Sequence, residues 1–152
     1  MANTQSMCTS FMGELLTATH NFTTGTGDTF KAALYEATAT YNASTTAYST
    51  SGEVTGTNYT PGGVAVTNGT SPASSNTSAT AGVAYWTPSA SITYTNVTLT
   101  TAFDAVLIYN STKSNKAVSV HTFGSQTVTA GTFTLTMPTN NTTNALLRLA
   151  TT

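Results

Sequence analysis

The pattern of hydrophobic and polar positions changes its period once along this chain. Near the N-terminus, apolar residues recur at spacings of three and four, as at Met7, Phe11 and Leu15. This spacing predicts one amphipathic helix over about residues 5–19. Gly13 lies inside this segment and weakens the helix by about 1 kcal/mol relative to alanine. From residue 29 onward an alternation of apolar and polar residues replaces the helical spacing.

Short alternating segments separated by polar turns make up the rest of the chain. The predicted strands cover residues 29–35, 64–67, 82–87, 91–99, 102–110, 116–123, 126–130, 132–137 and 145–149. This spacing predicts a mostly β fold, an antiparallel β-sandwich or jelly roll with one N-terminal helix. The length predicts a single domain over residues 1–152. Residues 68–81 are of low complexity, and we expect them to form a mobile loop.

The composition argues against several classes of binding partner. Charged residues make up 6% of the chain, against about 25% in an average globular protein. The net charge of −1 provides no field to attract nucleic acid or an anionic membrane. The longest apolar run, residues 105–109, is too short to cross a membrane as a helix. The 38 threonines favour strands and keep exposed faces wet without charge.

The residues for catalysis or metal binding are sparse. A hydrolytic triad would need a serine with His121 and Asp104, but no Gly-X-Ser-X-Gly segment is present. The single cysteine, Cys8, and the other histidine, His20, have no partners at the spacing of a metal site. We therefore expect no enzyme activity, no cofactor and no metal.

Three residues among the strands each have two interpretations. His121 follows the alternating residues 117–120 and is interpreted as a surface or interface residue. Trp86 is interpreted as a core residue, with an interface position as the alternative. Asp104 is either a solvated carboxylate at the side of a turn or a buried, hydrogen-bonded one.

The segment Tyr-Ser-Thr-Ser-Gly-Glu-Val-Thr-Gly-Thr-Asn-Tyr-Thr-Pro-Gly-Gly, residues 48–63, places one of only five carboxylates among glycines and tyrosines. Glu53 is either a solvated loop residue or a structural one that accepts hydrogen bonds and pins a tight loop. Pro61-Gly62-Gly63 predicts a turn, because proline presets φ and glycine supplies a positive φ. The candidate structural loop consists of Tyr48, Glu53, Tyr59, Gly62 and Gly63.

The apolar residues of the N-terminal helix form a second candidate site. This helix either caps the sandwich with its apolar side chains or acts as an arm that contacts another subunit. The candidate interface residues are Phe11, Met12, Leu15 and Leu16.

Residues 31–35 and 48–63 resemble small structural proteins encoded among the virion genes of tailed bacteriophages. Residues 102–110 and 128–135 continue the similarity, which extends over about residues 6–137. The shared order is a tyrosine, Glu-Val, Gly-Thr-X-Tyr and Gly-Gly, and it contains no catalytic residue. This chain has Asn58 where glycine is expected, and asparagine is a common substitute at positive φ.

The resemblance implies a component of the virion. We expect a capsid decoration, cement or accessory head protein that binds the major capsid protein or other virion subunits, as a homo-oligomer with a trimer favoured. The alternatives are a tail or fibre component that contacts the host surface and, from another class, a carbohydrate-binding module. Residues 1–16 lack a basic region followed by an apolar run. We therefore expect synthesis in the reducing host cytoplasm, with the virion as the final location.

Overall fold

The longest apolar runs of the sequence form the centre of the fold. The computed structural model describes residues 2–76 and 81–151. In it β2 (Phe30–Glu36) and β8 (Phe103–Asn110) pair antiparallel inside a five-stranded sheet of order β1-β9-β8-β2-β4. The outer strands are β1 (Ser6–Met7), β9 (Lys116–Gln126) and β4 (Val64–Val66). Residues 32–35 and 105–110 are buried without alternation, so both faces of this sheet are covered.

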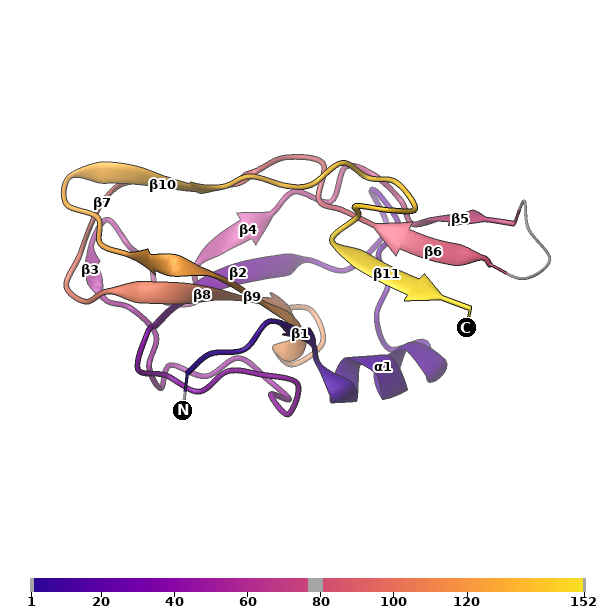
Figure 1. The fold of residues 1–152 in the computed structure, drawn as a ribbon, viewed down its shortest axis with the longest axis horizontal. Helices are drawn as coiled ribbons and strands as arrows, with labels where there is room; N and C mark the ends of the chain where they lie inside the picture. Colours follow the sequence, from indigo (N-terminus) through magenta and orange to yellow (C-terminus); the bar gives the residue numbers. More distant parts are fainter. Residues whose placement is uncertain (1, 77–80, 152) are drawn as a thin grey trace.

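A three-stranded sheet covers one face. Its strands are β10 (Gly131–Leu135), β7 (Ile92–Leu99) and β3 (Gly56–Thr57), in the order β10-β7-β3. Figure 1 shows this layer above the five-stranded sheet. Tyr94 of β7 is buried, and its hydroxyl donates to the carbonyl oxygen of Ala32 at 2.8 Å. The two layers form the β-sandwich, which confirms the predicted mostly β fold class.

A change of phase in β7 explains why its buried residues do not alternate throughout. Ile92, Tyr94, Val97 and Leu99 are buried, so the spacing changes from two to three and back. Asn96 lies in this step with a φ of 51°, and the pairing with β10 shifts register at the same place. The irregularity turns Val97 back toward the core.

Loops and the helix cover the other face of the five-stranded sheet. Figure 1 shows α1 (Thr9–Leu16) and the loop segments near the N-terminus on the side away from β7 and β10. The segment between β2 and β3 contributes two aromatic contacts to this layer. Tyr41 packs on Tyr35 with ring centroids 3.7 Å apart, and Tyr48 stacks on Tyr109 at 4.7 Å.

A second three-stranded sheet extends from one end of the sandwich (Figure 1). It contains β5 (Ala73–Ser75), β6 (Val83–Trp86) and β11 (Leu147–Ala150), in the order β11-β6-β5. Trp86 joins this sheet to the core, because it is 3% exposed and contacts Phe22 and Phe30. Its indole N–H donates to the Thr70 carbonyl at 2.9 Å. The core interpretation of Trp86 is therefore confirmed.

The N-terminal helix is shorter than the predicted 5–19. Ser6 and Met7 form β1 and pair with β9, because an edge strand of the five-stranded sheet offers them backbone partners. The helix ends at Leu16, and Ala18 follows with a φ of 55°, outside the helical range. The apolar spacing predicts the helix itself, but strand pairing with β9 takes the place of its first turn.

Two other predicted boundaries differ from the structure. No separate strand forms at 126–130, because β9 continues through Gln126 and the chain then turns, with Ala130 at a φ of 47°. In the predicted loop 68–81, Ala73–Ser75 form β5 and pair with β6. Residues 77–80 of that loop lie outside the described residues.

Candidate functional site

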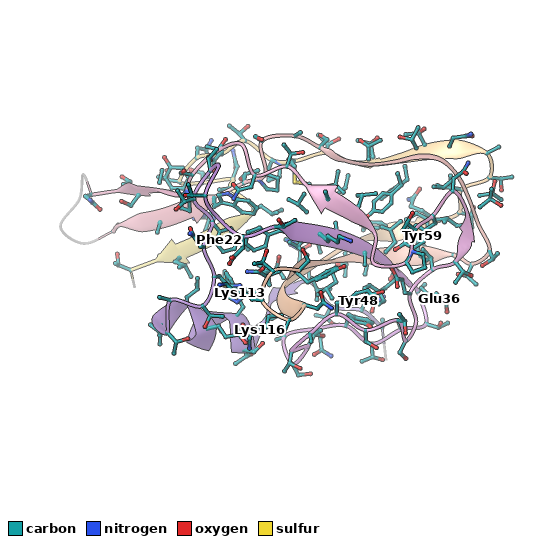
Figure 2. All side chains as sticks on the ribbon, turned by 180° about the vertical axis from the view of Figure 1, so that it is seen from behind. Phe22, Glu36, Tyr48, Tyr59, Lys113 and Lys116 are labelled. Atoms are coloured by element: carbon teal, nitrogen blue, oxygen red, sulfur yellow. The ribbon has the colours of Figure 1, made fainter. Side chains whose placement is uncertain are left out.

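The structure brings the five residues of the candidate loop into one hydrogen-bonded unit. Glu53 is 7% exposed and forms a bridge with Tyr35 of β2. Its carboxylate accepts hydrogen bonds from the Tyr48 hydroxyl at 2.7 Å and the Tyr59 hydroxyl at 2.8 Å. The Gly62 N–H donates to the same carboxylate at 2.7 Å. Figure 2 labels Tyr48 and Tyr59, which precede and follow Glu53 in the sequence.

The turn at Pro61-Gly62 positions the Gly62 N–H that donates to Glu53. The Gly63 N–H donates to the Thr60 carbonyl at 2.9 Å, and Gly62 has a φ of 89°. Pro61 and Gly62 therefore occupy the two central positions of the predicted turn, with the geometry of type II. Asn58 has a φ of 62°, the conformation expected where it replaces glycine.

Tyrosine hydroxyls connect this loop to the sheet. The Tyr109 hydroxyl donates to the Gly62 carbonyl at 2.8 Å, and the Tyr59 hydroxyl accepts the Leu34 N–H at 3.0 Å. Burial, and then the charge of Glu53, raise the pKa of Tyr109 to about 12. Burial also raises the pKa of Tyr59. These hydroxyls therefore remain protonated donors near neutral pH, and Glu53 acts as the acceptor around which the loop is built.

A second polar network fixes α1 to the end of the five-stranded sheet. The buried His20 lies between Glu14 of α1, 2.8 Å from Nε2, and the Asn110 amide nitrogen, 2.9 Å from Nδ1. Because the Asn110 amide nitrogen can only donate, Nδ1 accepts and Nε2–H donates to Glu14. Lys116 also donates to Glu14. Figure 2 shows Lys116 next to α1.

The acids of this network are held in their charged form. Burial would raise the pKa of Glu14, but hydrogen bonds from Lys116 and His20 outweigh it and hold the pKa below its ordinary value. Asp28 shows the same balance. Burial would raise its pKa, but hydrogen bonds from the Asn110 amide and a backbone N–H outweigh burial and hold the pKa below its ordinary value. Sequence analysis missed this network, because no local motif links residues 14, 20, 28 and 110.

The candidate catalytic residues do not form a triad. His121 Nε2 lies 2.8 Å from the Ser119 hydroxyl, but Ser119 is only 1% exposed. The Asp104 carboxylate accepts the Asn3 amide N–H at 2.6 Å and is partly buried, so it is hydrogen-bonded without being fully buried. Burial lowers the pKa of His121 to about 4. Ser119 is closed off from solvent, and within residues 2–76 and 81–151 no acid is hydrogen-bonded to His121. This serine is therefore not arranged as an accessible nucleophile.

The described part of the chain contains no candidate metal site and no candidate membrane-spanning helix. There, no group of three or more His, Cys, Asp or Glu residues could hold a metal ion. Cys8 is buried, and burial followed by the nearby charge of Glu14 raises its pKa to about 12. No described helix has the length and hydropathy needed to cross a membrane.

The four candidate interface residues on α1 separate into two pairs. Phe11 is 2% exposed and packs against His20 and Phe22, so it belongs to the core and is not available to a partner. Leu15 is partly buried. Met12 is 45% exposed and Leu16 is 90% exposed. Helical spacing alone could not tell the inner side chains from the outer ones.

Strand β11 carries a further exposed apolar side chain. Leu149 is 45% exposed, and with Met12 and Leu16 it completes the exposed large hydrophobic side chains of the described residues. Between α1 and β11 opens an apolar cavity of about 100 Å³, lined by Met7, Phe11, Leu15, Phe22, Pro72, Ala84, Tyr85, Trp86, Leu147 and Leu149. We call Met12, Leu16, Leu149 and this cavity the α1/β11 face.

Comparison with known proteins adds no constraint. No protein-family model matches the chain, and neither the curated proteins nor the solved structures contain a match. The function is therefore inferred from the groups that the chain itself buries and exposes.

Proposed function

We propose that this chain is a structural subunit of a tailed-bacteriophage virion, of the capsid decoration or accessory head type. It binds the major capsid protein or other virion subunits, self-associates, is made in the host cytoplasm and ends in the particle. The observation that carries the proposal is the α1/β11 face: α1 and β11 line one apolar cavity, and these two elements carry the exposed large hydrophobics of the described residues. An apolar cavity whose lining elements also expose apolar side chains on an otherwise polar surface is typical of a protein-binding site.

The remaining surface supports adhesion rather than steering by charge. The outer face of β7 and β10 exposes threonines, among them Thr93, Thr95, Thr132 and Thr134. Salt screens the attraction between exposed charges. A contact made by apolar and hydroxyl groups does not depend on that attraction, so it holds over a wide range of ionic strength. A particle that meets varied salt concentrations needs this property.

The carbohydrate-binding alternative is less well supported. Such sites need aromatic rings that are open to a sugar. Trp86 and five of the seven tyrosines are buried, and Tyr48 and Tyr85 are partly buried. The tail or fibre alternative uses the same α1/β11 face and is separated by where the protein binds on the particle.

Binding to phage heads that lack this chain tests the proposal. Wild-type protein added back is expected to bind the heads and raise the temperature at which they open. The double variant Met12→Gln/Leu16→Gln is expected to bind at least about tenfold more weakly, because two exposed apolar side chains leave the contact.

Thr95→Gln, on the exposed face of β7, is the matched control and should bind as the wild type does. Equal binding by the double variant and the control would contradict the role of the α1/β11 face. Binding to tails but not to heads would favour the tail alternative.

A further inference from the structure

Strand β11 is an uncovered edge of the three-stranded sheet. The strand order β11-β6-β5 leaves one side of β11 without a strand partner in the described part of the chain. The opposite edge of the sheet, β5, is less suited to pairing with another strand, because Pro72 directly precedes it and has no N–H to donate. An edge with free backbone groups can pair with another chain.

The register identifies the free groups of β11. The Thr151 N–H donates to the Gly82 carbonyl at 2.9 Å, so residues 151 and 82 form a hydrogen-bonded pair. Bonded pairs alternate along an antiparallel ladder, so Leu147 and Leu149 also bond to β6. The N–H and C=O groups of Arg148 and Ala150 therefore point away from the sheet.

The side chains at this edge are suited to self-pairing. Leu149 is half exposed and borders the apolar cavity, whereas Arg148 is exposed and forms no ion pair within the described residues. A two-fold arrangement that placed Arg148 opposite Arg148 would set like charges against each other, which is unfavourable. The register one residue further along places Leu149 opposite Leu149 and Arg148 opposite Ala150.

We propose that β11 pairs antiparallel with β11 of a second copy of this chain about a two-fold axis, with Leu149 opposite Leu149. Arg148 and Ala150 of each copy then exchange backbone hydrogen bonds, and the two three-stranded sheets become continuous. The facing leucines lie at a non-hydrogen-bonded position, where opposed side chains approach most closely. This contact buries Leu149 beside the cavity and does not depend on the virion assignment. It is two-fold, unlike the trimer favoured from the sequence.

Cysteine cross-linking of the full chain tests this register. The Leu149→Cys variant should form a covalent dimer with oxidised glutathione, because opposed residues in this position have the Cα separation that a disulfide requires. Arg148→Cys should remain largely monomeric on a non-reducing gel, because its counterpart is displaced along the strand. Cys8 is buried, so wild-type protein serves as the background control.

Sedimentation of the same proteins supplies the second measurement. Wild type should sediment as a dimer, and Leu149→Asp should dissociate at least about tenfold more readily, because two carboxylates then face each other. A wild type that sediments as a monomer or a trimer would overturn the proposal. Equal cross-linking at positions 148 and 149 would do the same.

Discussion

Replacing Glu53 with glutamine is expected to lower the melting temperature by about 6–12 °C. The wild-type carboxylate accepts hydrogen bonds from Tyr48, Tyr59 and the Gly62 N–H while it is almost fully buried. Glutamine keeps one acceptor oxygen but turns an NH₂ donor toward groups that are themselves donating. Loss of charge-assisted bonds in a buried site costs about 3 kcal/mol, which gives this shift in a chain of 152 residues.

Glu36→Gln is the matched control for this substitution. Glu36 is more exposed, and within residues 2–76 and 81–151 its carboxylate accepts hydrogen bonds from the hydroxyls of Thr38 and Thr101 alone. Its replacement should change stability by less than about 0.5 kcal/mol. Thermal unfolding followed by circular dichroism compares the two variants, and equal melting temperatures for Glu53→Gln and wild type would reduce Glu53 to an ordinary loop residue.

Replacing Gly63 with alanine is expected to have the largest effect of any substitution considered, more than about 4 kcal/mol. A Cβ at this position would lie 1.6 Å from the Ala32 carbonyl oxygen, and the residue has a φ of 71°. The obstructing atom belongs to the backbone of β2, which is held between β4 and β8 and cannot move away cheaply. We expect the variant to lose its cooperative unfolding transition or its soluble yield.

The same substitution at Gly13 is the control. Gly13 is exposed on α1, with no heavy atom within 4 Å of an added Cβ. Alanine is a better helix former than glycine, so Gly13→Ala should be neutral or stabilise the protein by up to about 1 kcal/mol. A Gly63→Ala variant that melts as Gly13→Ala does would show that the close approach of the loop to β2 is not needed.

Local patterns in the sequence predicted the longer strands, because these contain apolar runs or bury alternate positions, whereas the short strands β1, β3 and β5 were not predicted. The residues of β2, β8 and β10 stand out by apolar runs or alternation, and the turn at Pro61-Gly62 follows from the φ preferences of the two residues. The predicted ends of these elements lie within a few residues of the observed ones.

The features that sequence analysis missed depend on contacts between distant segments. Ser6 and Met7 form a strand only because β9 offers them an edge. The link from Asn110 to His20 spans 90 residues, and no pattern in either segment signals it. Burial of Phe11 beside an exposed Leu16 depends on how α1 is oriented on the sheet. For Glu53, the sequence left two interpretations open, and the distances show the carboxylate at the centre of the loop.

Quantitative mass spectrometry of purified phage particles tests most directly whether this chain works by adhering to other virion subunits. We predict that the chain remains in intact particles after separation from free protein on a density gradient, at a copy number comparable with that of the major capsid protein. A few copies per particle would contradict the head assignment. Absence from particles, with abundant free protein in the infected-cell lysate, would contradict the structural role altogether.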